Sequence, residues 1–169
     1  MSITEILYDF ADETISAGCF IPVILAVLTA ALLIREIFIK GSKGNKILYA
    51  CGLLISLFIS VSVIGNWVLQ SADFKAALRN DECSVVSGTV RDFSTPSALG
   101  HDTEHFTVDD VYFEYGQGGS VGYCETRALG GVIKGNGQQL TIHYVTVDGE
   151  NIILKIEGER VESIKPTGE

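Results

Sequence analysis

Residues 17–39 read AGCFIPVILAVLTAALLIREIFI, and residues 47–69 read ILYACGLLISLFISVSVIGNWVL. Each stretch has 23 residues, and as an α-helix each is about 35 Å long at about 1.5 Å per residue. The hydrocarbon core of a bilayer is about 30 Å thick, so either stretch is long enough to cross it. The segment KGSKGNK at residues 40–46 is basic and is too short to form anything but a tight turn. These features predict a membrane α-helical hairpin with two transmembrane helices over residues 17–69.

Basic residues around the two apolar stretches predict how the hairpin is oriented. The hinge region carries four of them: Arg35, Lys40, Lys43 and Lys46. Segment 1–16 has none and is acidic. Since Lys and Arg in short loops stay on the cytoplasmic side, we expect the hinge in the cytoplasm and both termini outside. A secretory signal peptide begins with a positive segment, so the first span is expected to remain as an anchor in a bacterial cytoplasmic (inner) membrane.

The charge of the chain is concentrated in its second half. Residues 1–70 contain 4 Lys/Arg and 5 Asp/Glu, whereas residues 71–169 contain 8 and 16, which gives the second part a net charge of −8 out of −9. Nucleic-acid binding depends on clustered Lys and Arg, so we expect no nucleic-acid partner. About 95 residues are sufficient for a small domain with its own core.

The pattern of the second half divides it into a linker at residues 70–81, a β domain at residues 82–165 and a tail at residues 166–169. Segment 1–16 is expected to be an acidic N-terminal tail. In the β domain, apolar residues alternate with polar ones and the runs are separated by Gly, Asp and Pro, which is typical of short strands. The expected strands are residues 83–93, 106–116, 120–126, 140–147 and 151–164.

Two turns connect these strands in the sequence. Asp148-Gly149 predicts a tight hairpin, and Asp109-Asp110 is a candidate turn that would split the second run in two. We therefore predict a small all-β domain, a five- to six-stranded antiparallel barrel of the OB or SH3-like kind, because closure removes exposed edges. Its expected core consists of Val111, Phe113, Tyr115, Leu140, Ile142 and Tyr144.

Three runs of the β domain, GHDTEHFTVDDVYFEY, GGVIKGNGQQLTIHY and NIILKIE, carry a resemblance that covers about 75 residues without the hairpin. The resemblance is to a family of small bacterial proteins with a β-rich domain and no established activity. It implies a β fold and no particular activity or cofactor. The matching positions are Val85 or Val86, Gly88, Val90, Phe93, Gly100, His101, Glu104, Phe106, Val108, Val111, Phe113, Tyr115, Gly130, Gly131, Ile133, Gly135, Tyr144, Ile152, Leu154 and Glu157.

Polar side chains that bind metals are densest before the second strand, at His101, Asp102, Glu104 and His105. Imidazoles and carboxylates are ligands of divalent metals, which makes His101, Glu104 and His105 candidate metal ligands. Neighbouring side chains of an extended segment diverge, however, so we expect a solvated loop and no metal. A response of these histidines to pH is an alternative.

Cys83 and Cys124 both lie in the β domain, while Cys19 and Cys51 lie in the apolar stretches. In an oxidising compartment the first two are expected to form a disulfide. A zinc site is the alternative, although the chain has no CxxC spacing.

The segment from Gly130 to Gly137 is rich in glycine, and Arg127 and Lys134 flank it. Glycines cradle a phosphate where a helix follows, but GQQLTIHYV predicts a strand, so a turn-forming loop is expected. Arg127, Lys134 and Tyr123 are retained as a candidate surface for a ligand or partner.

No GxSxG, HExxH or Ser-His-acid arrangement is present, so we expect no enzyme and no cofactor. The sequence favours a membrane-anchored β-barrel module on the extracytoplasmic face. Its expected partners are the lipid bilayer and an envelope protein or component, or a second copy of the chain. The alternative is a ligand-gated effector whose cytosolic barrel senses a nucleotide and disrupts the membrane, and an enzyme anchored by the hairpin is a third possibility.

Overall fold

The computed structural model describes residues 4–15, 17–95, 103–116 and 121–159. The chain forms two compact units. The hairpin unit comprises Thr14–Ser71, and the β unit comprises Met1–Glu13 together with Ala72–Glu169. The β unit is therefore discontinuous, because the hairpin unit is inserted between its first strand and the rest of the sheet.

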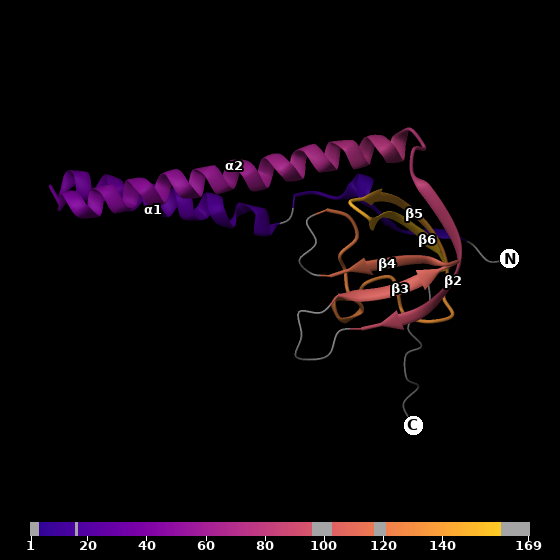
Figure 1. Cartoon of the computed structure of the whole chain (residues 1–169). Coiled ribbons are helices and arrows are strands. Elements are labelled where there is room, and N and C mark those ends of the chain that lie inside the picture. Colours follow the sequence, from indigo (N-terminus) through magenta and orange to yellow (C-terminus); the bar gives the residue numbers. More distant parts are fainter. Residues whose placement is uncertain (1–3, 16, 96–102, 117–120, 160–169) are drawn as a thin grey trace, which may run out of the picture. The chain divides into compact units, whose positions relative to one another are not determined.

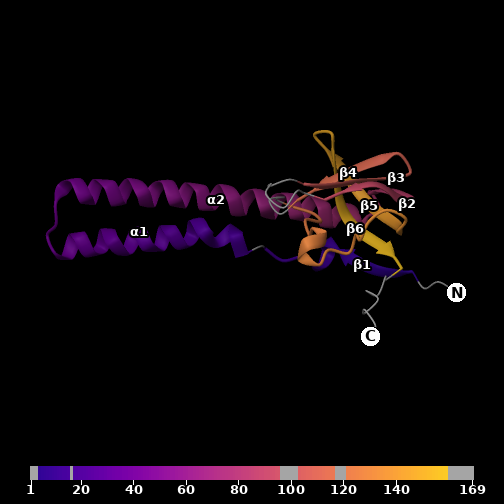
Figure 2. The ribbon, with the colours of Figure 1, turned by 90° about the horizontal axis from the view of Figure 1, so that it is seen from below.

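Two long antiparallel helices lie side by side in the hairpin unit (Figures 1 and 2). A 3-10 turn, η2 (Ala17–Phe20), precedes α1 (Ile21–Phe38), and α2 (Lys43–Arg79) has 37 residues. Both helices contain a stretch long and apolar enough to cross a membrane, and most residues of these stretches lie on the surface. The prediction of two long apolar helices is confirmed. Helix α2 also includes residues 70–79, for which the sequence predicts a linker.

The hinge between the helices is a tight turn, as predicted. Lys40 has a positive φ of 52°, and the Gly41 N–H donates to the carbonyl of Glu36 at 2.9 Å, which is a typical end of an α-helix. A Cβ atom at Gly41 would overlap the Glu36 carboxylate, so a larger residue here would require the Glu36 side chain to move. Ser42 caps the N-terminus of α2, because its hydroxyl accepts the Asn45 N–H at 3.2 Å.

Small residues allow α1 and α2 to approach each other closely. A Cβ atom on Gly52 of α2 would lie 3.5 Å from the Thr29 methyl group of α1. One and two turns further along α2, Ser56 and Ser60 are buried, and so is Ala26 of α1. The Ser60 hydroxyl donates to the Ser56 carbonyl at 2.6 Å and the Ser56 hydroxyl to the Leu53 carbonyl at 3.0 Å, so both buried hydroxyls are paired. Close packing through small side chains is the usual mode of helix association in membranes.

The β unit is built on one six-stranded antiparallel sheet in the order β1-β6-β5-β2-β3-β4 (Figure 1). Its strands are β1 (Glu5–Asp9), β2 (Ser84–Ser94), β3 (Glu104–Val108), β4 (Val111–Tyr115), β5 (Gln139–Val147) and β6 (Glu150–Gly158). Positive φ values at Asp109 and Asp110, and at Asp148 and Gly149, confirm both predicted turns. The two hairpins are β3–β4 and β5–β6.

Two strands differ from the sequence-based prediction. Residues 5–9, expected in an acidic tail, form β1 and pair with β6, with Glu5 opposite Gly158. Within the described part of segment 120–126, no strand forms. That segment instead leads to the 3-10 turn η3 (Arg127–Leu129). A second short turn, η1 (Phe10–Asp12), follows β1.

The sheet is curved but open, so the predicted closed barrel is wrong and the OB or SH3-like topology stays a prediction. Closure would require the two end strands, β1 and β4, to pair, but among the described strands β1 pairs with β6 and β4 with β3. On the outer edge of β6, the Tyr123 N–H also donates to the Ile153 carbonyl at 3.0 Å. Strand β4 reaches β6 through a side chain, since Asn151 Nδ2 donates to the Tyr112 carbonyl at 2.9 Å.

The core of the β unit lies inside this curve. Phe106 and Phe113 stack with ring centroids 5.2 Å apart. Of the six predicted core residues, four are buried, and Val111 and Tyr144 are partly buried against them. The buried cluster consists of Val86, Val90, Phe106, Val108, Phe113, Tyr115, Tyr123, Ile133, Leu140, Ile142, Ile153 and Ile156.

Candidate functional site

Glu104 and His105, two of the candidate metal ligands, face opposite sides of the sheet. Glu104 is 1% exposed, whereas the His105 ring lies beside the Tyr112 ring, 5.9 Å between centroids. Strand β3 begins at Glu104, and successive side chains of a strand alternate between faces. His101 and Asp102 lie outside the described residues. In the described part of the chain, no group of three His, Cys, Asp or Glu side chains is placed to hold a metal ion.

The Glu104 carboxylate instead anchors the connection between β4 and β5. It accepts a hydrogen bond from the Tyr115 hydroxyl at 2.8 Å. Its two oxygens also accept the Arg127 main-chain N–H, at 2.8 and 2.9 Å. Arg127 begins η3, and the first N–H groups of a helical turn have no partner within it. These bonds offset the cost of burying the carboxylate and fix η3 to β3.

Three tyrosines form a cluster next to this carboxylate, which we name the tyrosine cluster: Tyr8, Tyr115 and Tyr123. The Tyr123 ring lies 5.0 Å from that of Tyr115 and 4.9 Å from that of Tyr8. The Tyr123 hydroxyl accepts the Val132 N–H at 2.7 Å. Tyr123 is thus buried and holds the β4–β5 connection in place, rather than forming an exposed contact surface.

The candidate surface of Arg127, Lys134 and Tyr123 is not formed as one surface. Lys134 Nζ donates to the Gly131 carbonyl at 2.6 Å and so stabilises its own loop. Arg127 and Lys134 are exposed to solvent, whereas Tyr123 is buried and does not belong to the same surface. The glycine-rich segment runs into β5 without an intervening helix, so the expected turn-forming loop is observed and a phosphate cradle is not.

Cys83 and Cys124 are both free thiols, so the predicted disulfide is wrong. Cys83 directly precedes β2. Cys124 follows Tyr123, whose main chain is bonded to β6. Strand β5 lies between β2 and β6 in the sheet, which keeps the two thiols apart. Burial raises the pKa of both thiols, and nearby carboxylates raise it further.

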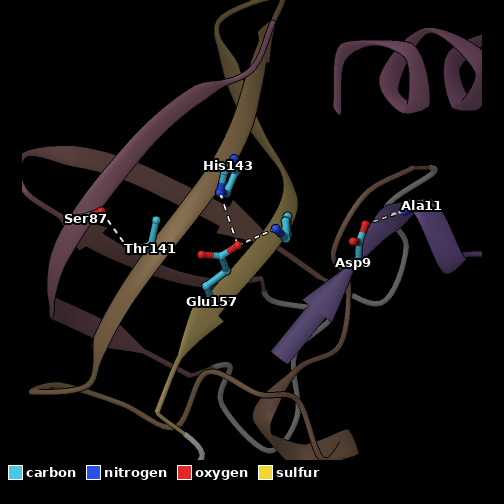
Figure 3. Close-up of polar contacts among 7 residues, drawn as sticks. Asp9, Ala11, Ser87, Thr141, His143 and Glu157 are labelled. Carbon is cyan, nitrogen blue, oxygen red and sulfur yellow. Dashed lines mark hydrogen bonds and ion pairs between the residues drawn. The ribbon is translucent and has the colours of Figure 1, made fainter. Parts of the chain in front are cut away.

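A polar face that the sequence analysis missed lies on the outer side of β2, β5 and β6. Figure 3 shows the Ser87 and Thr141 hydroxyls, 2.9 Å apart, and His143 Nε2, 3.8 Å from Glu157 Oε1. Lys155 also pairs with Glu157. These residues alternate along their strands with the core residues and therefore face the opposite side of the sheet. This alternation with a period of two residues could have identified the polar face from the sequence.

A second outer face, on β3 and β4, presents exposed groups of mixed chemistry. Tyr112 is 49% exposed, and its hydroxyl donates to Glu114 at 3.0 Å. Thr103 donates to the other oxygen of the same carboxylate. These hydrogen bonds, from Thr103 and then from Tyr112, lower the pKa of Glu114, so its charge is held in place beside an aromatic ring.

Alkaline pH is expected to destabilise the β unit through the tyrosine cluster. Burial raises the pKa of Tyr8, Tyr115 and Tyr123 well above the ordinary value of 10.0. In the unfolded chain these hydroxyls ionise near pH 10, whereas in the folded unit they stay protonated. The stabilisation that these three hydroxyls contribute should therefore be fully present well below pH 10 and be lost as the pH rises above it. Urea midpoints measured across this range test this. A midpoint that is unchanged above pH 10 would contradict it.

Comparison of the chain with protein-family models, with curated proteins and with solved structures gave no match. The function is therefore inferred from the geometry described above.

Proposed function

We propose that the chain is a membrane-anchored, non-enzymatic binding module, in which the hairpin unit spans the bilayer and the β unit contacts a partner protein. The observation that carries the proposal is the apolar surface of α1 and α2. Large apolar side chains are exposed along both helices, among them Leu28, Phe38, Leu54, Phe58 and Val61. In water such a surface is unfavourable, whereas in a bilayer it faces lipid.

The orientation proposed is a cytoplasmic hinge, with the N-terminus and the β unit on the outer side of a bacterial cytoplasmic membrane. The four basic residues of the hinge region support it. The sheet adds a second argument, because β1 precedes both spans and β6 follows them, yet the two strands pair. They must lie on the same side of the membrane, and two crossings satisfy that requirement.

The contact surface proposed for the partner is the outer face of β3 and β4. It combines the exposed ring of Tyr112 with the ionised Glu114 carboxylate, and aromatic residues are enriched at protein interfaces. The net charge of −8 on the second half of the chain favours an envelope protein or a second copy over a nucleic acid.

Orientation is tested first, with a C-terminal reporter that is active only outside the cytoplasm and a counterpart active only inside. Activity of the outside reporter, with membrane association that resists alkaline carbonate, is the expected result. Activity of the inside reporter would contradict the proposal and favour the cytosolic ligand-gated effector. A hinge-charge variant with Lys40, Lys43 and Lys46 changed to Gln serves as the control, because it should weaken the preference.

The contact surface is tested with a photo-crosslinking amino acid at position 112. Val85, which is 55% exposed on β2, provides a matched control position. A crosslinked product of defined mass from position 112 and none from position 85 is the expected result. Equal products from both positions, or none from either, would argue against this surface.

A further inference from the structure

The segment after β1 is tied to the last turns of α2 within the β unit. Lys75 Nζ donates to the main-chain carbonyls of Ala11 and Glu13, at 3.1 and 2.9 Å. The Phe10 ring is buried and packs edge-on against Phe74, with centroids 6.2 Å apart. The Lys75 ammonium also lies 5.7 Å from the Phe10 ring centroid, a cation–π contact. We name these five residues the Lys75 latch.

Strand β1 itself is held only modestly by the sheet. It has five residues and lies at the sheet edge, next to β6 alone. Its register slips between Ile6 and Tyr8, and Ile6 is exposed. The Tyr8 hydroxyl is buried with no hydrogen-bond partner, which costs free energy. The two hydrogen bonds from Lys75 to main-chain carbonyls therefore add to the pairing with β6 in keeping this edge in place.

Strand β1 is the part of the sheet that precedes α1 directly in the sequence. Strand β1 and η1 run on through residues 13–20 into α1, whereas α2 continues directly toward β2. A pull on α1 therefore acts along the chain on β1, and the latch connects that segment back to α2. Edge strands and their flanking segments belong to the parts of a protein that open locally at low free energy.

We propose that β1 is a releasable strap, that Lys75 is the residue that holds it closed, and that its release uncovers the outer edge of β6 beside Cys124. The proposal concerns the β unit and does not depend on which side of a membrane the unit lies. In the closed form, Lys75 bonds main-chain oxygens, so these bonds do not use the side chains of residues 11 and 13.

Cys124 provides a natural reporter for the opening of the strap. Tyr8 packs on Tyr123, the neighbour of Cys124, and the Glu13 carboxylate raises the pKa of the Cys124 thiol in addition to burial. Departure of β1 and Glu13 both exposes this thiol and makes it easier to ionise. Cys83 lies at β2, on the other side of β5, and serves as the internal reference.

The experiment measures maleimide labelling of the full chain in detergent or nanodiscs, with Cys19 and Cys51 changed to Ala. Lys75→Met keeps the aliphatic stem and removes the donors. Loss of charge-assisted hydrogen bonds is expected to raise the labelling rate of Cys124 about 10-fold, with Cys83 unchanged. Lys75→Arg should stay within about two-fold of the parent because it keeps the donors. Arg79→Met removes a cation from the last turn of α2 and is the matched control. Its Cys124 labelling rate should also stay within about two-fold of the parent rate.

Hydrogen exchange provides the second readout. Amides of residues 5–13 should exchange faster in Lys75→Met, while those of β2 to β5 keep the parent rate. Unchanged Cys124 labelling in Lys75→Met would overturn the proposal. Faster labelling of Cys83 and faster exchange throughout the sheet would also overturn it, because Lys75 would then stabilise the whole unit rather than the strap.

Discussion

Glu104→Ala is expected to lower the free energy of unfolding of the β unit by about 2–4 kcal/mol. The variant leaves the Tyr115 hydroxyl and the Arg127 N–H without their acceptor in a buried site. An unpaired buried donor costs about 1–3 kcal/mol, and the space left by the side chain adds to the loss. Urea unfolding followed by tyrosine near-UV circular dichroism measures the change, and faster exchange of the Arg127 amide should accompany it.

Glu114→Ala is the matched control for this prediction. Glu114 also accepts hydrogen bonds from two side chains, Thr103 and Tyr112, but it lies on the exposed face of the sheet. Its removal should cost less than about 1 kcal/mol, because water replaces the lost partners. Equal losses in the two variants would show that burial of Glu104 does not determine its contribution.

Phe113→Ala is expected to destabilise the β unit by about 3–5 kcal/mol. The Phe113 side chain is fully buried. Its ring stacks on Phe106 and meets the Tyr144 ring edge-on, with 5.2 Å between centroids in each pair. Truncation leaves a cavity where the curved sheet closes over its core. The same urea titration measures the loss.

The adjacent residue provides the control for the core variant. Tyr112→Ala removes an aromatic ring of similar size from the outer face of the same strand. Because that ring is 49% exposed, a loss of at most about 1 kcal/mol is expected. If Tyr112→Ala destabilises the unit as much as Phe113→Ala, the assignment of the inner and outer faces of β4 is incorrect.

Local patterns predicted much of this architecture. The two apolar stretches became α1 and α2, and Asp148-Gly149 became the β5–β6 turn because such turns need positive φ. Alternation of Phe113 and Tyr115 with polar neighbours correctly identified core positions. In each case the residues that form the pattern also form the structural element. Local sterics and burial are then sufficient to determine the structure.

Features that depend on distant partners were missed. Residues 5–9 are short and acidic, and only β6, at the other end of the described chain, makes them a strand. The Cys83–Cys124 prediction failed because sheet order, which no local pattern determines, separates the two residues. Helix α2 continues past residue 70 to Arg79, where Phe74 contacts Phe10 from a segment distant in the sequence.

Glu104 is a different case, because its role was visible in the sequence. Glu104, Phe106 and Val108 share one face of a strand by period-two alternation, and all three are buried. Starting the strand at residue 106 placed Glu104 and His105 together in a loop cluster. Starting it at residue 104 separates them and assigns the carboxylate to the core.

The pairing of Glu5 with Gly158 constrains how the protein is made. The ribosome delivers β1 first and its only neighbour, β6, after all the other strands, so the sheet edge is the last part of the unit that can be completed. In the membrane topology proposed above, both helices have to be inserted during that interval, and the N-terminal segment has to reach the compartment in which the later strands emerge. In that topology, a chain with a single misplaced crossing has β1 and β6 in different compartments and cannot pair them, so completion of the sheet depends on correct insertion of both helices.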